Sequence, residues 1–208
     1  MDWIPKQPPE HILGKESQNP RRIFVDLGSG SYPAVFDGNR KLEEDDYYVG
    51  VEQKRTEIDR ALSTDTAKNS ANLDKLGGNV FFLEHNMNLS KLPFADSSVN
   101  EVVMGNILGN DNIILHTFKI FLNEANRILK EDGVLVVFDT VTPGQARYLS
   151  NPYGSDNAML ELLEKSGFEV VKEVKYGDSD FETELSKYKQ SHVRLKKGNE
   201  FIMYFRKK

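Results

Sequence analysis

An apolar run that ends on an acid and a Gly-x-Gly turn constrains the fold of this chain more than any other feature. The run spans residues 22–27 and includes Asp26, and Gly28-Ser29-Gly30 follows it at once. Glycine lets the backbone turn sharply and lets it approach a ligand without a Cβ clash. In an α/β protein this pattern predicts a first strand that opens into a nucleotide-binding loop.

The spacing argues against a dinucleotide site. The dinucleotide fingerprint is Gly-x-Gly-x-x-Gly, whereas Pro33 occupies the third glycine position here. Asp26 would also place a negative charge beside a pyrophosphate. A carboxylate at this position favours a ligand with cationic groups.

Length and composition indicate one soluble α/β domain. The chain has 208 residues, 38% of them hydrophobic and 28% charged, with no cysteine and a net charge of −5. These values suit a globular protein, and the charge argues mildly against a general nucleic-acid binder. Neither a membrane span nor a secretory signal is recognisable, so we expect a cytoplasmic protein with an N-terminal arm (1–20) and a single domain (21–208).

Strand-like and helix-like segments alternate along the chain, which predicts a doubly wound, mostly parallel sheet. The C-terminal strands lack an obvious crossover between them and therefore predict an antiparallel edge hairpin. The fold class expected is thus α/β, Rossmann-like, with seven strands. Strands are expected at 22–27, 47–52, 80–85, 100–105, 134–139, 168–174 and 201–205, and helices at about 54–67, 116–129 and 156–166.

Polar residues mark the ends of the first four expected strands. They are Asp26, Glu52, Asn86 and Asn106. Ligands of open α/β sheets bind at the carboxyl ends of the strands. Glu52 suits the two hydroxyls of a ribose because a carboxylate has two acceptor oxygens and no donor. Dinucleotide enzymes use an acid in the same role, so Glu52 alone does not separate the two types of site.

Three further stretches extend the pattern. They are Tyr47–Glu52, Leu92–Val103 and Phe121–Leu135. Together with Val25–Gly30 they resemble, in order, the motifs of the class I S-adenosylmethionine-dependent methyltransferases. Within that family the chain most resembles the methyltransferase type 11 group. Asn100 stands where that family usually has Asp, and Glu131-Asp132 replaces its Pro-Gly.

The resemblance implies an enzyme with S-adenosyl-L-methionine as cofactor. Within it, Asn86 would accept a hydrogen bond from the adenine amine, Met87 would form an apolar wall, and Tyr32 would shape the methionine end of the pocket. The cofactor-binding residues implied are Asp26, Gly28, Ser29, Gly30, Tyr32, Glu52, Gln53, Asn86, Met87 and Asn106.

No catalytic base is fixed by the sequence. Asn106, Asp111 and His116 are weak candidates for catalytic residues, and the four histidines are too scattered to indicate a metal site. The stretch 106–112 does not match the Asn/Asp-Pro-Pro-aromatic motif of amino-methylating nucleic-acid enzymes.

Three functions remain open. The first is a methyltransferase acting on a small-molecule acceptor, because the compact chain has no added RNA-binding domain. The second is a tRNA or rRNA methyltransferase, which the Val49–Glu52 run and the basic segment from Lys187 to Lys208 would favour. Residues 181–208 carry eight Lys or Arg against three Glu. The third is a non-catalytic Rossmann-like module that binds the cofactor. Neither a membrane nor a metal partner is expected.

Overall fold

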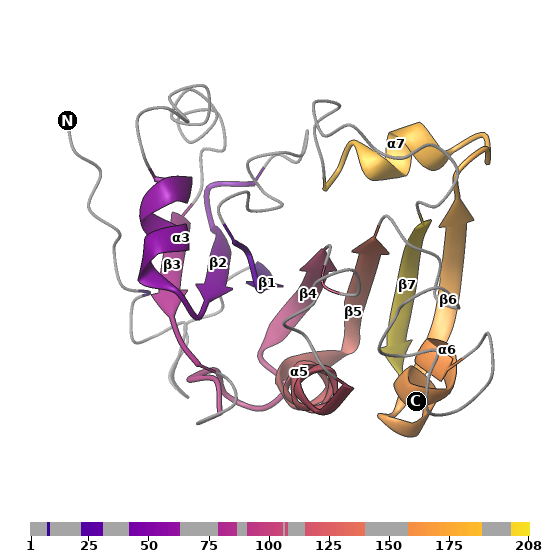
Figure 1. Ribbon diagram of the computed structural model, residues 1–208, viewed down its shortest axis with the longest axis horizontal. Coiled ribbons are helices and arrows are strands. Elements are labelled where there is room, and N and C mark those ends of the chain that lie inside the picture. Colours follow the sequence, from indigo (N-terminus) through magenta and orange to yellow (C-terminus); the bar gives the residue numbers. More distant parts are fainter. Residues whose placement is uncertain are drawn as a thin grey trace.

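A seven-stranded sheet forms the centre of the computed structural model, with helices on both of its faces (Figure 1). The strand order is β3-β2-β1-β4-β5-β7-β6. The strands are β1 Arg22–Leu27, β2 Asp46–Glu52, β3 Asn79–Glu84, β4 Val99–Gly105, β5 Leu129–Asp139, β6 Phe168–Lys175 and β7 Phe201–Lys207. The helices are α3 Arg55–Ala61, α5 Leu115–Ile128, α6 Ala158–Lys165 and α7 Phe181–Leu185.

The structure describes residues 8, 22–30, 42–62, 79–86, 91–105, 107, 115–139, 158–188 and 201–208. The expected N-terminal arm lies outside these ranges except for Pro8, so the division into an arm and one domain stays a prediction. In the described part of the chain, no helix is both long enough and apolar enough to cross a membrane.

The pairing confirms the predicted fold class. Strands β1 to β5 pair in parallel. Strand β7 runs antiparallel between β5 and β6 and pairs with both. The C-terminal antiparallel hairpin expected from the sequence is therefore present, with β6 on the outside.

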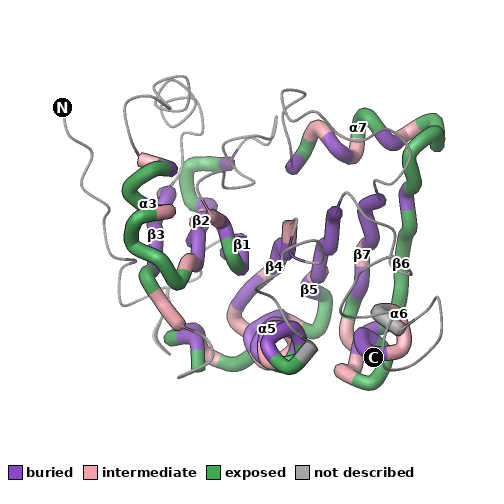
Figure 2. The backbone as a smooth tube through the Cα atoms, in the orientation of Figure 1, coloured by how far each residue is buried: buried purple, intermediate pink, exposed green. Residues whose placement is uncertain are grey.

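Alternate residues of the central strands face opposite layers. Val25 and Leu27 belong to the same apolar cluster as residues of α5 and α6, whereas Phe24 belongs to the cluster that includes residues of α3. Helix α7 covers the α3 face further along the sheet, against β5 and β7. The middle strands are buried and β6 is largely exposed (Figure 2), which is the burial expected of a sheet covered on both faces except at its edge.

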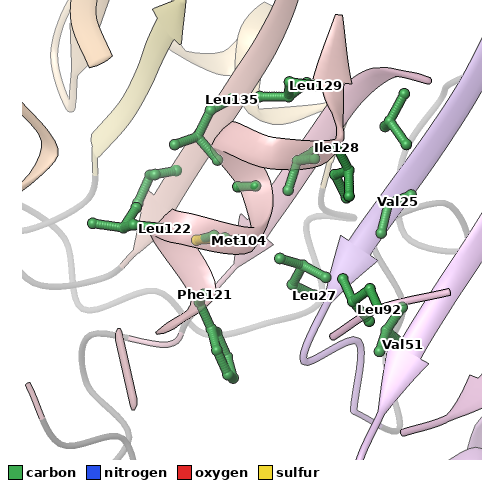
Figure 3. Packing of buried hydrophobic residues seen from close by; sticks show 14 of the residues in the cluster. Val25, Leu27, Val51, Leu92, Met104, Phe121, Leu122, Ile128, Leu129 and Leu135 are labelled. Carbon is green, nitrogen blue, oxygen red and sulfur yellow. The ribbon is translucent and has the colours of Figure 1, made fainter. Parts of the chain in front are cut away.

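Helix α5 supplies much of the larger core. Its buried residues recur at helical spacing, and Figure 3 shows Phe121, Leu122 and Ile128 among strand residues such as Leu27 and Met104. This spacing predicted a helix over 116–129, and the observed bounds differ by one residue at each end.

Three elements differ from expectation. Strand β5 begins at Leu129 instead of residue 134, because Leu129 pairs with Val99 before the register shifts so that Glu101 pairs with Val134. Helix α3 ends at Ala61 with Leu62 as its C-cap, short of the expected end near residue 67, and residues 63–67 lie outside the described residues. Helix α7 lies within the stretch 176–199, whose form the sequence did not indicate.

Candidate functional site at the carboxyl ends of the strands

The glycine loop (Gly28–Gly30) folds back onto the end of β2. The amides of Gly28 and Ser29 both donate to the carbonyl oxygen of Val51, at 2.9 and 3.1 Å. Gly28 and Gly30 have φ angles of 73° and 57°, which side chains with a Cβ rarely adopt. The two glycines thus permit the turn that brings the loop against the neighbouring strand.

Glu52 ties this loop to the start of helix α3. One carboxylate oxygen accepts the amide of Gly30 and the other accepts the amide of Lys54, each at 3.0 Å. The carbonyl oxygen of Glu52 also accepts the amide of His85 at 3.0 Å. The end of β2 is therefore a junction between the glycine loop, α3 and the residue after β3.

Ser29 places a buried hydroxyl beside this junction. Its Oγ has no hydrogen-bond partner among the residues that the structure describes, although Ser29 is only 6% exposed. A Cβ on Gly50 would lie 3.0 Å from Ser29 Oγ and 2.8 Å from the ring of Phe82. Gly50 therefore leaves the room in which the Ser29 side chain sits. An unsatisfied buried hydroxyl is costly, so this one suits a position that a ligand completes.

Asp26 is buried at the end of β1, with 3% of its surface exposed. Tyr48 donates its hydroxyl to Oδ2 of Asp26 at 2.5 Å. Sequence reasoning singled out Asp26 and missed Tyr48, because an aromatic residue within a strand is ordinary and carries no local signal. Only the pairing of β1 with β2 brings the two side chains together.

The other predicted site residues are distributed as follows. Gln53 is exposed in the bend after β2, and Asn86 is half-buried just after β3. His116 is exposed on the first turn of α5. Four predicted site residues lie outside the described residues: Tyr32, Met87, Asn106 and Asp111.

The ends of β4 and β5 are closed by aromatic residues. A Cβ on Gly105 would overlap the ring of Phe138, its partner across the two strands. The Phe138 ring stacks on Tyr188 with the centroids 5.8 Å apart. Within the described ranges, no group of three or more His, Cys, Asp or Glu side chains is arranged to hold a metal ion.

Comparison with known proteins identifies the fold. No protein-family model and no curated protein matches the sequence. Solved structures do match. A TehB-like S-adenosylmethionine-dependent methyltransferase from Corynebacterium glutamicum is 15% identical, with a TM-score of 0.54 over 90% of this chain and 80% of that one.

Two further matches have the same character. A possible histamine N-methyltransferase from Thermotoga maritima is 20% identical, with a TM-score of 0.52 over 92% of this chain and 84% of that chain. Geranyl diphosphate C-methyltransferase from Streptomyces coelicolor, solved with S-adenosyl-L-homocysteine, is 14% identical, with a TM-score of 0.52 over 95% and 77%. This chain therefore has the fold of the class I S-adenosylmethionine-dependent methyltransferases.

Proposed function

We propose that this chain is an S-adenosylmethionine-dependent methyltransferase that acts on a small-molecule acceptor. The observation that carries the proposal is the pair of hydrogen bonds that the amides of Gly30 and Lys54 donate to the Glu52 carboxylate. It joins the glycine loop and an acid at the carboxyl edge of the sheet, where α/β folds bind nucleosides. The fold supports the proposal, and membership of the type 11 group stays a prediction.

The described residues suit this cofactor. A carboxylate has about four acceptor sites, so Glu52 can hold its two backbone amides and still accept ribose hydroxyls. Asp26 supplies a negative charge for the ammonium of the amino-acid end, and the buried Ser29 hydroxyl supplies a polar atom that has no hydrogen-bond partner among the described residues. Asn86, half-buried after β3, supplies an acceptor for the adenine amine.

Methyl transfer places modest demands on the protein. Bound S-adenosylmethionine supplies an electrophilic methyl group on a sulfonium, which becomes a neutral thioether. The protein therefore has no leaving-group charge to stabilise, and its main contribution is to hold the acceptor in line with the methyl group. A base is needed only where the acceptor must lose a proton. His116, exposed on the first turn of α5, is our candidate for such a base.

A small acceptor is favoured over RNA by the ion pairs of the basic segment. Lys187, Arg206, Lys207 and Lys208 pair with Glu184, Glu169, Glu131 and Glu164 respectively. Such pairing lowers the positive potential that a nucleic-acid surface requires. Two of the fold neighbours also bear the names of enzymes with small acceptors, histamine and geranyl diphosphate.

Calorimetry with S-adenosylhomocysteine tests the cofactor site. We expect the wild-type protein to bind, and Asp26→Ala and Glu52→Ala each to bind about tenfold to a hundredfold more weakly, as for the loss of a hydrogen bond to a charged group. Glu84→Ala is the matched control, because Glu84 is an exposed acid paired directly with Glu52 in the sheet.

The controls make the outcome decisive. Glu84→Ala should bind like the wild type. Wild-type affinity in Asp26→Ala or Glu52→Ala contradicts the site assignment. No binding by the wild type at millimolar ligand contradicts the function itself. Transfer of a labelled methyl group to bulk tRNA, with none to a small-metabolite extract, contradicts the proposed acceptor class.

A further inference from the structure

Tyr48 is a buried residue of β2 that contacts the proposed site through Asp26. It is 3% exposed and belongs to the apolar cluster formed by β1, β2, β3 and α3. In the sheet register Tyr48 pairs with Phe24, and Asp26 pairs with Gly50. The Tyr48 hydroxyl therefore reaches two residue pairs further along the sheet, to the next pair on the same face, and meets Asp26 where Gly50 has no side chain.

Apolar packing alone does not require the hydroxyl. Phenylalanine would fill the same space beside Phe24, Ile58 and Val80, its neighbours in the cluster. A buried phenol needs a hydrogen-bond partner to offset its lost hydration. Asp26 Oδ2 is such a partner at 2.5 Å, which is the distance of a charge-assisted O–H···O⁻ bond.

The bond also fixes the carboxylate. Asp26 comes two residues before Gly28, and the glycine loop is anchored to β2 by its amides on Val51. The Asp26 carboxylate cannot rotate freely while the Tyr48 hydroxyl is hydrogen-bonded to it. Its charge thus keeps a fixed position relative to the loop, and preorganised charge binds a ligand more strongly than charge that must first be ordered.

We propose that Tyr48 is a positioning residue that orients the Asp26 carboxylate toward the ammonium group at the amino-acid end of the cofactor. This inference rests on the proposed function, because it assigns Asp26 to a particular part of that ligand. Tyr48 itself does not touch the cofactor. Its hydroxyl should therefore matter for ligands with the amino-acid group and not for ligands that lack it.

The test compares two ligands by calorimetry on wild-type protein and Tyr48→Phe. S-adenosylhomocysteine has the amino-acid group, and 5′-methylthioadenosine has the same nucleoside and thioether without it. We expect Tyr48→Phe to bind S-adenosylhomocysteine about tenfold more weakly and 5′-methylthioadenosine within twofold of the wild type. In an Asp26→Ala background, Tyr48→Phe should change S-adenosylhomocysteine affinity by less than twofold.

Tyr47→Phe is the matched control. Tyr47 is the preceding residue of β2, and its ring faces the opposite layer, stacked on Phe81 with centroids 6.1 Å apart. It should bind both ligands like the wild type.

Each outcome bears on one proposal. Unchanged binding of S-adenosylhomocysteine by Tyr48→Phe overturns the positioning role. Equal loss of both ligands, including loss through failure to fold, assigns Tyr48 to packing and overturns it as well. A wild-type protein that binds neither ligand contradicts the proposed function instead, so the two failures are distinguishable.

Discussion

Gly50 controls how closely the glycine loop approaches β2. A methyl group there would lie within 3.0 Å of both the Phe82 ring and Ser29 Oγ. We predict that Gly50→Ala lowers the free energy of unfolding by about 1–3 kcal/mol, as overpacking does in other cores. Urea denaturation measures the change.

A double-mutant cycle separates overpacking from the backbone effect of alanine. Phe82→Leu leaves room at the ring position, so Gly50→Ala should cost less in that background than in the wild type. Strict additivity of the two substitutions would show that the contact with Phe82 is not the cause.

At the scale of single residues, the sequence indicated the charged residues of the site but not their hydrogen-bond partners. Asp26 and Glu52 stand at strand ends, which local pattern can recognise. The partners of these acids were hidden, because Tyr48 is 22 residues from Asp26 and Gly30 is 22 residues from Glu52. A single sequence does not indicate which residue of a neighbouring parallel strand or loop donates a hydrogen bond to a given carboxylate.

Among the elements, α5 is fastened to the segment 91–98 by a nearly buried ion pair. Arg127 donates to both carboxylate oxygens of Glu124 at 3.0 and 2.8 Å, and to the carbonyls of Leu92 and Phe94 at 2.9 and 2.8 Å. The amide of Leu92 returns a bond to Glu124 at 2.9 Å. Burial acts to raise the pKa of Glu124, but the bonds from Arg127 and Leu92 lower it overall.

Arg127→Met should therefore be costly. It leaves the Glu124 carboxylate buried without its cation, for which about 3–5 kcal/mol of unfolding free energy is typical. Arg60→Met is the control: Arg60 also pairs at i,i+3, with Glu57, but is 69% exposed, so its loss should cost no more than about 0.5 kcal/mol. Equal effects of the two substitutions by urea denaturation would contradict this account.

A second polar network holds α7 to the C-terminal hairpin. Glu184 accepts bonds from Lys172 and Lys187, at 2.9 and 2.6 Å, and from the hydroxyl of Tyr204. Burial acts to raise the pKa of Glu184, but these three donors outweigh it and lower the pKa to about 2. Burial, with Tyr188 and Glu184 nearby, raises the pKa of Tyr204, so its hydroxyl remains a donor.

This network predicts a pH dependence of stability. Because the folded pKa of Glu184 lies below the unfolded value near 4.5, its contribution is complete above pH 4.5 and is lost as the pH falls toward 2. We expect Glu184→Gln to be less stable than the wild type by about 2 kcal/mol at pH 7, after screening of the half-exposed lysines. That difference should shrink to near zero at pH 2. A constant difference by urea denaturation at each pH would contradict the assignment.

The elements differ in how well their sequences predict them. Helix α5 was predictable because its apolar residues recur on one face. Helix α7 was not predictable, because five residues are too few for a periodic pattern. The burial of Phe181 and Leu185 depends on the sheet residues against which they pack. The early start of β5 was missed because Glu131, Asp132 and Gly133 read as a turn, whereas the structure accommodates them in a register shift.

Across the whole molecule, ion pairing of the basic segment predicts weak contact with nucleic acid. Four of its cations are neutralised by glutamates, and the chain has a net charge of −5. We expect no binding to bulk tRNA at physiological salt, measured by filter retention. Binding that weakens steeply with added salt would show a phosphate-contacting surface and would favour the RNA methyltransferase alternative.

The topology as a whole was the most predictable feature. Alternating strands and helices indicated a parallel sheet, and the missing crossover before residue 201 indicated the antiparallel end. The acceptor was the least predictable, because stretches such as residues 140–155 follow no local pattern that indicates what they bind.

The place of β7 between β5 and β6 has a consequence for synthesis. Until the ribosome has made the residues from Phe201 onward, β6 lacks β7, the strand with which it pairs. The backbone groups of Leu135–Phe138 that bond to β7 are also unpaired, so this part of β5 is an exposed strand edge. Such edges attract other nascent chains. A polypeptide halted at Asn199 should therefore accumulate in the insoluble fraction, whereas one that includes β7 can close this edge and remain in solution.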